Sequence, residues 1–279
     1  MTTSGEVSLD FLGTGGGRFV MTSQRRRTAG IRLTQGDTRV HLDPGPGALV
    51  FSNWAGLSPR ELNGLIITHC HPDHYTDAEV FIEAMTDGTR AKQGVLAGTK
   101  SVLRGADGIG PCISGYHQGL LRDLIEMYEG TRFSVGDLDF TATEARHSDP
   151  HSVGLRVSSS QGGIGYTSDT GYFPGLADSY TGLRLLVLCT MWPRGNPINI
   201  HLNTDEALRV LEESRPKACI LTHFGMRMLN AGPEGEAAYL QKETGIPVVA
   251  ARDGMKAHIS DVITLQDPRK TDEPMTIDA

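Results

Sequence analysis

The sequence predicts an α/β fold with one large mixed sheet or two sheets, and three observations support this prediction. The chain of 279 residues carries short apolar, β-branched runs along most of its length, which is the pattern of buried strands. Segments with apolar residues on one helical face lie between these runs. Strands outnumber helices in the first part of the chain and then alternate with them, as in α/β proteins.

Each expected element follows from its local pattern. The predicted strands are, in chain order, residues 7–12, 31–34, 38–42, 65–68, 138–143, 153–157, 164–167, 185–189, 218–221 and 248–250. Residues 77–85 and 120–128 each place apolar side chains along one helical face. The clearest helix is expected at residues 204–214, where Asn203 can cap the first turn and Glu206 can complete a capping box.

Composition and charge limit the classes of function. Hydrophobic residues make up 38% of the chain, which is enough for a substantial core. The formal net charge of -7 argues against broad nonspecific binding of nucleic acid, which needs a basic field. Arg25, Arg26 and Arg27 nevertheless form a local basic patch. The four cysteines lack the spacing of a disulfide framework and are expected to be reduced thiols.

No internal repeat or linker divides the sequence. We therefore expect one domain over residues 1–266, followed by a polar, flexible tail over residues 267–279. The first residues lack the basic and apolar regions of a secretory signal, and no apolar run reaches the length of a membrane span. The sequence therefore predicts a cytoplasmic protein without membrane association.

The most informative stretch of the chain places three histidines and one aspartate within six residues, directly after a predicted strand. His69 and His71 lie two residues apart in extended backbone and can turn their rings toward one point. Asp73 and His74 can reach a second point nearby. Imidazole and carboxylate groups suit zinc, and also manganese or iron. Cys70 should face the opposite side of the extended segment, so we do not expect it to be a ligand.

A centre with two metals needs further ligands, which we expect at the ends of other strands. His147 and His151 follow one predicted strand, and either could bind. Asp169 lies just beyond another strand, where its two oxygens could bridge two metals. His223 ends a third strand. Each residue alone is a common turn or capping residue, but their occurrence together with the first motif favours a dinuclear site.

The chain resembles the metallo-β-lactamase-fold hydrolases in the order and spacing of seven side chains: His69, His71, Asp73, His74, His147, Asp169 and His223. The resemblance covers nearly the whole chain. It implies a four-layer αββα sandwich, in which two mixed β-sheets lie between outer helices and a dinuclear site lies at a sheet edge. It also implies that one metal is held by His69, His71 and His147, that the other is held by Asp73, His74 and His223, and that Asp169 bridges the two.

The choice of His147 over His151 follows from the resemblance of this segment to ribonuclease Z. In that group the ligand precedes the start of a strand by several residues. The match is imperfect, because Val153 and Leu155 replace aromatic residues of the family pattern.

The ligand set implies hydrolysis by a metal-bound hydroxide. Two cations that share a water lower its pKa and neutralise charge on the substrate oxygens. Asp73 could orient the nucleophile or accept its proton. Asp43 resembles the strand-end aspartate of the family and could accept a hydrogen bond from a ligand histidine, although an aspartate before Pro44 is equally typical of a turn.

Within the family, the chain is most similar to the ribonuclease Z-like phosphodiesterases. Residues 11–17 and 25–30 resemble the opening of that branch, and residues 201–207 resemble its histidine-containing motif before a helix. By this resemblance His201 lies over the metals and protonates the leaving oxygen, a role for which an imidazole near its ordinary pKa is suited at neutral pH. His71 stands where diiron members carry a carboxylate, which favours hydrolysis over redox chemistry.

The sequence leaves the substrate open between RNA and a small nucleotide-like phosphodiester. The chain is acidic, lacks an obvious basic arm to clamp tRNA, and holds few cations in residues 91–119, a Gly-rich segment that could be a lid or substrate loop. Arg18, Arg25 to Arg27, Arg194 and Arg227 could contact phosphate, but the sequence does not rank them.

Two other functions are compatible with the same ligands. One is a lactone or thioester hydrolase, and the other is a metal-binding regulatory protein without catalytic activity. Two divalent ions are expected, with zinc as the first choice and manganese or iron as alternatives. The resemblance also implies a homodimer.

Overall fold

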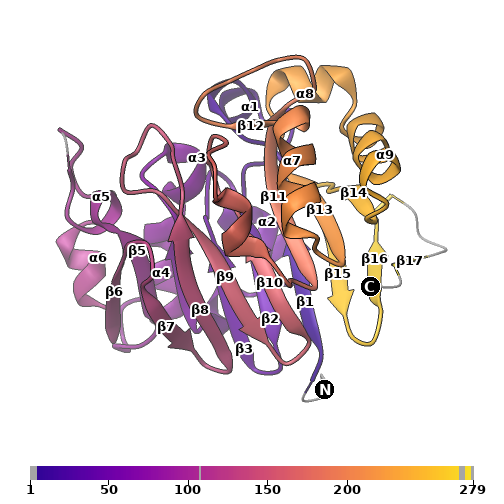
Figure 1. The fold of residues 1–279 in the computed structure, drawn as a ribbon. Helices are drawn as coiled ribbons and strands as arrows, with labels where there is room; N and C mark the ends of the chain where they lie inside the picture. Colours follow the sequence, from indigo (N-terminus) through magenta and orange to yellow (C-terminus); the bar gives the residue numbers. More distant parts are fainter. Residues whose placement is uncertain (1–4, 107, 270–273, 278–279) are drawn as a thin grey trace.

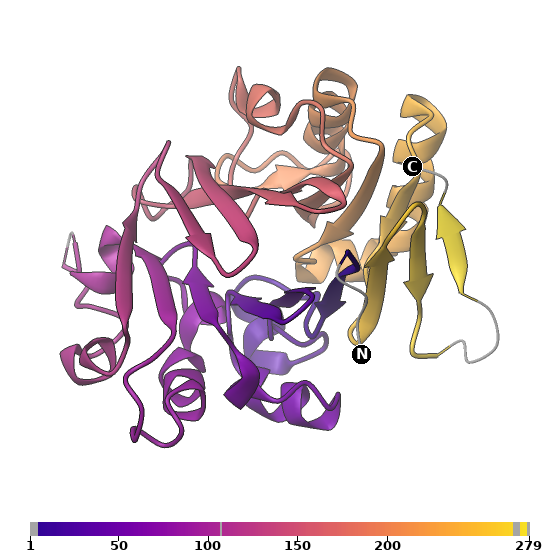
Figure 2. The ribbon, with the colours of Figure 1, turned by 90° about the horizontal axis from the view of Figure 1, so that it is seen from below.

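Two β-sheets pack face to face, and helices cover their outer surfaces (Figure 1). A computed structural model describes residues 5–106, 108–269 and 274–277. The view from below shows the sheet built from the first part of the chain lying against the sheet built from its middle part (Figure 2). The predicted α/β architecture, an αββα sandwich with two mixed sheets, is therefore confirmed.

The first sheet has nine strands in the order β17-β16-β15-β1-β2-β3-β4-β5-β6. The strands are β1 (Val7–Phe11), β2 (Ile31–Gln35), β3 (Thr38–Leu42), β4 (Gly64–Ile67), β5 (Val95–Thr99), β6 (Asp123–Met127), β15 (Met255–Ile259), β16 (Ile263–Gln266) and β17 (Met275–Ile277). Strands β3 to β6 run parallel, and the remaining pairs are antiparallel. Helical crossovers connect the parallel strands, because such strands cannot be joined by tight hairpins.

The second sheet follows the order β14-β13-β11-β10-β9-β8-β7, with β12 paired beside β11. Its strands are β7 (Arg132–Val135), β8 (Leu138–Glu144), β9 (Val153–Ser159), β10 (Gly162–Tyr166), β11 (Leu185–Trp192), β12 (Leu202–Asn203), β13 (Ala218–Thr222) and β14 (Val248–Ala250). Strands β7 to β10 form antiparallel pairs, whereas β10, β11, β13 and β14 are parallel.

The helices lie on the outer faces of the two sheets. They are α1 (Arg18–Ser23), α2 (Ala48–Trp54), α3 (Pro72–Tyr75), α4 (Ala78–Met85), α5 (Lys100–Leu103), α6 (Gly115–Gly119), α7 (Thr204–Ser214), α8 (Met226–Ala231) and α9 (Pro233–Thr244), with 3-10 turns η1 (Pro59–Glu61) and η2 (Leu176–Tyr180). The predicted capping box of α7 is present. Asn203 Oδ1 accepts from the Glu206 amide at 2.9 Å, and Glu206 Oε2 accepts from the Asn203 amide at 3.0 Å.

Three groups of buried apolar side chains hold the layers together. The largest lies between the sheets and includes Leu9, Phe140 and Val187, and one further group lies under the helices on each outer face. Full burial of such a side chain contributes about 1.5–3 kcal/mol. Successive side chains of a strand point to opposite faces of its sheet, so each strand contributes to the core between the sheets and to the layer under the helices.

The helix predicted at residues 120–128 is wrong, because this segment forms the edge strand β6. Its backbone pairs in parallel with β5. Ile125 and Met127 pack against the core between the sheets, whereas Leu124 is 47% exposed. The spacing of the buried side chains is therefore two, and pairing with the sheet overrides a helical pattern in a short segment.

Two other segments differ from their sequence-based description. The Gly-rich segment 91–119 contains the buried strand β5 together with α5 and α6, so much of it belongs to the sandwich. Within the expected tail, β17 pairs with β16, while residues 270–273 and 278–279 lie outside the described residues. The domain division at residue 266 stays a prediction. None of the helices in the described ranges is long and apolar enough to cross a lipid bilayer.

Candidate metal centre

The side chains predicted to bind metal all follow the carboxyl end of a strand. His69 and His71 come after β4, and His147, Asp169 and His223 come after β8, β10 and β13 respectively. The short helix α3, which begins with Pro72, carries the remaining two. Because the two sheets face each other, the ends of β4 in one sheet and of β8, β10 and β13 in the other meet at one edge of the sandwich.

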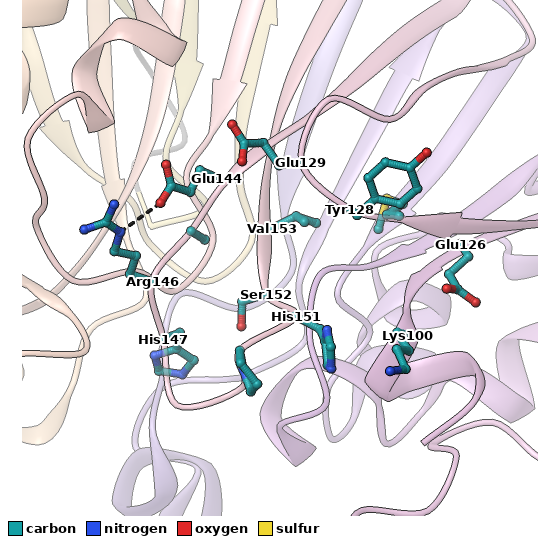
Figure 3. A pocket seen from close by; sticks show the side chains of 13 residues that line it. Lys100, Glu126, Tyr128, Glu129, Glu144, Arg146, His147, His151, Ser152 and Val153 are labelled. Carbon is teal, nitrogen blue, oxygen red and sulfur yellow. Dashed lines mark hydrogen bonds and ion pairs between the residues drawn. The ribbon is translucent and has the colours of Figure 1, made fainter. Parts of the chain in front are cut away.

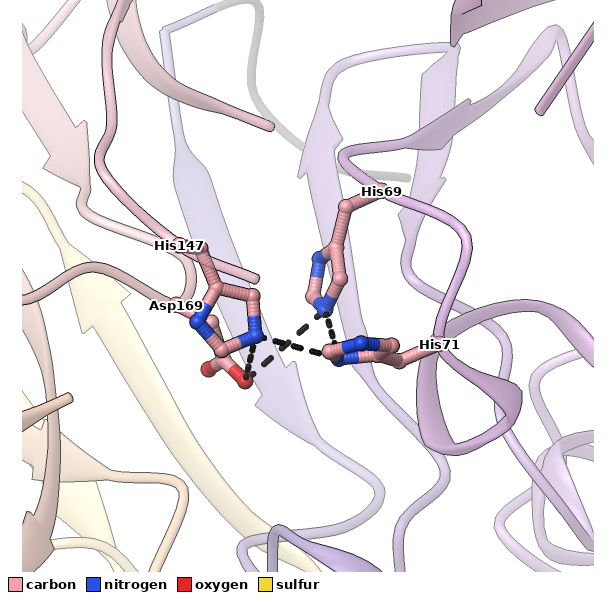
Figure 4. A group of neighbouring side chains, drawn as sticks. All are labelled: His69, His71, His147 and Asp169. Atoms are coloured by element: carbon pink, nitrogen blue, oxygen red, sulfur yellow. Dashed lines mark hydrogen bonds and ion pairs between the residues drawn. The ribbon is translucent and has the colours of Figure 1, made fainter. Parts of the chain in front are cut away.

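Three ring nitrogens and one carboxylate oxygen form the first group (Figure 4). His71 Nδ1 lies 3.1 Å from His69 Nε2 and 3.0 Å from His147 Nε2. Asp169 Oδ2 lies 3.8 Å from His69 Nε2 and 3.7 Å from His147 Nε2. Metal–nitrogen bonds of 2.0–2.1 Å in a tetrahedron require ligand separations of about 3.3–3.4 Å. The observed spacing therefore fits a cation at the centre of this group.

A second group lies beside the first. His74 Nε2 and His223 Nε2 are 3.1 Å apart, and Asp73 Oδ2 lies 3.8 Å from the former and 3.5 Å from the latter. Asp169 Oδ2 is 3.5 Å from His74 Nε2. The same oxygen atom thus belongs to both groups. The sequence suggested that the two oxygens of this carboxylate could each serve one metal, whereas the structure places one oxygen between the two groups.

A bound cation would explain how the carboxylate of Asp169 is buried. Its side chain is buried, and its Oδ1 has no hydrogen-bond partner within the described part of the chain. Oδ1 lies 3.2 Å from His223 Nδ1 without hydrogen-bond geometry. A buried carboxylate oxygen without a hydrogen-bond partner is costly unless a cation compensates it. The donor set, of imidazole nitrogens and carboxylate oxygens, fits divalent transition metals.

Asp43 fixes one of these imidazoles from behind. His74 Nδ1 donates to Asp43 Oδ2 at 3.0 Å, and this bond leaves Nε2 free to face the candidate site. The Tyr166 hydroxyl and the Thr68 hydroxyl donate to the same oxygen at 2.9 and 2.8 Å, and the Thr68 amide donates to Oδ1 at 2.8 Å. Asp43 thus makes the hydrogen bond that a residue supporting a metal-binding histidine would make, and its contacts exceed those of a turn residue.

Three other imidazoles in the centre are held by the ring nitrogen that faces away from it. His147 Nδ1 donates to the Ile200 carbonyl at 2.7 Å. His69 Nδ1 lies 3.1 Å from Thr68 Oγ1, and Ser148 Oγ lies 3.2 Å from His71 Nε2. Such contacts set the tautomer and the orientation of each ring, as is usual for histidines that bind metals.

The glycine-rich loop after β1 packs directly against the centre. A Cβ atom on Gly16 would lie 2.2 Å from the ring of His223, so only glycine fits there. The amide of Gly17 donates to Asp73 Oδ2 at 2.7 Å. The loop therefore lies against the candidate centre and also orients one of its carboxylates.

Comparison with known proteins assigns the family. Residues 38–224 match the model of the beta-lactamase superfamily domain. The chain belongs to the β-lactamase superfamily. An uncharacterised protein of Methanocaldococcus jannaschii is 39% identical over 255 residues, which cover 91% of this chain and 95% of that protein. Ribonuclease Z of Thermococcus kodakarensis is 28% identical over 140 residues, or 50% of this chain and 43% of that enzyme.

Solved structures of the β-lactamase superfamily show the same fold. The metallo-β-lactamase fold protein YhfI of Bacillus subtilis superposes with a TM-score of 0.74 at 16% identity, over 91% of this chain and 99% of that one. The short form of human tRNase Z superposes with a TM-score of 0.65 at 17% identity, over 91% and 99% of the two chains. At these identities the likeness establishes the fold.

His201 lies in the loop before β12, next to both groups. Its Nδ1 is 3.6 Å from Asp169 Oδ2, and its ring centroid lies 4.7 Å from that of His147 and 5.9 Å from that of His223. Burial lowers the pKa of His201 to about 4, which differs from the ordinary value expected. The ring is therefore neutral at pH 7.

Burial and neighbouring charges shift the pKa values of the side chains at this candidate centre in different directions. Burial alone would lower the pKa of His74, but the carboxylates of Asp73, Asp169 and Asp43 raise it well above its ordinary value. Burial lowers the pKa of His69 far below that of a free imidazole, and the neighbouring His74 adds to this effect. Burial alone would raise the pKa of Asp73 and Asp169, but the neighbouring histidines lower it, so both carboxylates are ionised. A cation bound beside His74 would displace the proton that these carboxylates favour on its ring.

The structure separates the two candidate histidines of the segment after β8. His147 belongs to the first group, whereas His151 lines a neighbouring cavity of about 520 Å³ (Figure 3). Sequence reasoning missed the buried Asp149 between them, which accepts from the amides of Cys70 and His151 at 3.0 and 2.9 Å and from Ser101 Oγ at 2.5 Å. The signal was an aspartate before a proline, which alone indicates only a turn.

Proposed function

We propose that this chain is a hydrolase that uses two divalent metal ions to cleave phosphodiesters. The observation that carries the proposal is Asp169 Oδ2, which lies within 4 Å of ring nitrogens from both groups of side chains. One group would hold one ion through His69, His71 and His147, and the other group would hold the second through Asp73, His74 and His223. Zinc is the metal we expect first, with manganese or iron as alternatives.

The two ions would acidify a shared water and neutralise charge on the substrate oxygens. The residues of the chain then have separate tasks. Asp73 is held by the Gly17 amide and can accept a hydrogen bond from the nucleophile, which orients it. His201 is neutral and can donate its N–H to a substrate oxygen. A phosphate placed beside this ring would raise its pKa, so that the ring takes up a proton from solvent and can then pass this proton to the leaving oxygen.

The phosphodiester assignment is supported by the partial match to ribonuclease Z and by the position of His201. Because the alignment covers less than half of that enzyme, the substrate is a proposal, and RNA and small nucleotide-like diesters both fit it. Homodimerisation and a cytoplasmic location belong to the same proposal.

A parallel assay of three substrates tests the proposed reaction. We expect metal-loaded protein to hydrolyse bis-p-nitrophenyl phosphate or a pre-tRNA, and to leave an N-acyl-homoserine lactone unchanged. His201→Ala should lower phosphodiester turnover by about 10²–10⁴-fold, the range of a general acid, while its metal content stays at that of the wild type. Lactone turnover that is indifferent to this substitution would favour the lactone or thioester hydrolase, and fully loaded protein without any turnover would favour the regulatory alternative.

Elemental analysis tests the ligand assignment independently of activity. Wild-type protein should carry about two ions per chain, as a two-metal site requires. Asp169→Ala, which removes the shared ligand, and His223→Ala should both lower this number. Lys217→Ala, which changes an exposed side chain, is the control. Unchanged metal content in Asp169→Ala and His223→Ala would refute the assignment.

A further inference from the structure

Three arginines beside the candidate metal centre have no carboxylate partner. Arg18, Arg25 and Arg227 are exposed, and in the described ranges none of them forms an ion pair with an acidic side chain. Arg25 Nη1 donates to Asn230 Oδ1 at 2.5 Å. The guanidinium group of Arg227 lies 4.3 Å from the centroid of the Trp192 ring. These contacts orient two of the three groups without neutralising their charge.

Some arginines elsewhere in the described residues are compensated by carboxylates. Arg194, which the sequence could not distinguish from these three, pairs with Glu236 at 3.3 Å, and Arg252 pairs with Glu234. The chain as a whole carries a formal net charge of -7. Three uncompensated guanidinium groups in one region therefore form a local positive field against the overall charge, and guanidinium groups bind phosphate oxygens through paired N–H donors.

Two of the three arginines follow residues of the centre closely in the sequence, and a hydrogen bond links the third to α8. Arg18 begins α1 directly after Gly17, whose amide binds Asp73. Arg227 lies in α8, which begins three residues after His223. Figure 1 shows α1 and α8 next to each other, and the bond from Arg25 to Asn230 joins them. We call this set, Arg18, Arg25 and Arg227, the arginine rim.

The opposite side of the centre has a mixed charge. The cavity of about 520 Å³ next to His147 is lined by the carboxylates of Glu126, Glu129 and Glu144 together with Lys100 and Arg146 (Figure 3). Glu144 pairs with Arg146 at 2.8 Å, and Glu126 pairs with Arg104 at 3.1 Å. The cavity lies at the β6 and β8 end of the sandwich, whereas α8 follows β13 near the other end of the second sheet. An additional phosphate would meet carboxylates beside the cations on this side, and guanidinium groups without carboxylate partners on the other.

We infer that the arginine rim is a second phosphate subsite, so that the substrate is a small nucleotide-like phosphodiester with an additional phosphate group on the α1–α8 side. This inference rests on the proposed phosphodiesterase function and names its substrate class. The scissile phosphate lies between Asp73, Asp169 and His201, and the uncharged end of the substrate points toward the cavity beside His147.

Hydrolysis of the dinucleotide ApA, with and without an additional phosphate at its 5′ or 3′ end, tests the subsite. In wild-type protein we expect a terminal phosphate at one end to raise kcat/KM by about tenfold or more, the value of one charge-assisted contact. In the triple variant Arg18→Ala, Arg25→Ala, Arg227→Ala this gain should fall below about twofold, while kcat/KM for ApA stays at the wild-type value. The gain should also shrink as salt rises from about 0.05 to 0.5 M, because exposed charges are screened.

Two controls separate the subsite from general effects. Arg122→Ala removes an exposed arginine that pairs with Asp123 at the edge of the first sheet, and it should leave the gain unchanged. The metal content of every variant is also measured, and substitutions in the arginine rim should leave it at the wild-type value. Equal kcat/KM for the phosphorylated and unphosphorylated dinucleotides in wild type, or a gain that survives in the triple variant, would overturn the inference.

Binding of pyrophosphate by calorimetry separates failure of the subsite from failure of the proposed function. We expect metal-loaded wild-type protein to bind it about tenfold more tightly than the equally loaded triple variant. If no dinucleotide is hydrolysed but the two proteins differ in pyrophosphate affinity, the phosphodiesterase assignment is refuted and the subsite is supported. If dinucleotides are hydrolysed and the two proteins bind pyrophosphate equally, the subsite is refuted and the phosphodiesterase assignment is supported.

Discussion

Asp43→Asn should weaken metal binding without changing any ligand. Asp43 is buried and accepts four hydrogen bonds, from the amide and the hydroxyl of Thr68, from the hydroxyl of Tyr166 and from His74 Nδ1. Its backbone has a positive φ of 52°, a conformation that asparagine tolerates well. The substitution therefore removes the charge and one acceptor while the backbone stays in place.

The expected loss of metal affinity in Asp43→Asn follows from these four hydrogen bonds. An asparagine side chain has one oxygen, so either Oδ1 or Oδ2 of Asp43 is replaced by an amide nitrogen that cannot accept. In one orientation the Thr68 amide loses its acceptor, and in the other His74 Nδ1 and the hydroxyls of Thr68 and Tyr166 lose theirs. A buried donor without a partner costs about 1–3 kcal/mol. Loss of a partner behind a metal-bound histidine typically lowers metal affinity by about 10–100-fold, or about 1.4–2.8 kcal/mol, which agrees with that cost.

Competition with a chelator measures this effect directly. Metal-loaded wild type and Asp43→Asn are dialysed against increasing concentrations of a buffered chelator, and the remaining metal is determined by elemental analysis. The variant should lose the ion held by His74 at a free-metal concentration about 10–100-fold higher than the wild type. Tyr166→Phe, which removes one donor to Asp43 and leaves His74 untouched, is the matched control. Equal metal retention in wild type and Asp43→Asn would refute the reasoning.

Two further predictions concern packing and protonation. Gly16→Ala places a Cβ atom 2.2 Å from the His223 ring and should lower the metal content toward about one ion per chain. The control Gly115→Ala, with open space around its Cβ, should retain both ions. Elemental analysis measures the metal content, and circular dichroism checks that both variants are folded. Burial holds the pKa of His41 well below its ordinary value, so the unfolded chain takes up a proton below about pH 6.5 that the folded chain does not. The free energy of unfolding should therefore fall by about 1.4 kcal/mol per pH unit below pH 6.5 from this group, and denaturant titrations of metal-loaded His41→Gln should show a slope smaller by that amount.

The sequence predicts two of the strands that carry the candidate site because β4 and β13 are buried throughout and mostly apolar. His69 and His223 follow these two runs closely. The strand β10 is rich in glycine and is buried only over its last three residues, and Asp169 lies three residues beyond it. The edge strand β6 was mistaken for a helix because half of its side chains face solvent. A five-residue edge strand with a mixed pattern does not specify its own secondary structure, since its partner strand supplies the missing information.

The residues that support the candidate ligands were harder to predict from the sequence. Asp43 was identified only through the family resemblance, and Asp149 was missed, because both lie before prolines, where an aspartate normally indicates a turn. Their partners lie far away in sequence: Asp43 binds Tyr166, and Asp149 binds the Cys70 amide. Such long-range pairs follow from how the two sheets are placed against each other, which no local pattern encodes.

Backbone strain is concentrated at the same edge of the sandwich. Asp43, Ser168 and His223 all adopt positive φ angles, of 52°, 52° and 61°, and each conformation costs a residue other than glycine about 1–2 kcal/mol. Glycine would remove this strain, but it could not supply the carboxylate that holds His74, the hydroxyl that lies 2.6 Å from Thr68 Oγ1, or the imidazole of the second group. The sharp turn after each strand is what directs these side chains toward one point. A cation bound there would offset the strain through its ligands, because binding energy to the folded state adds to the stability of the fold.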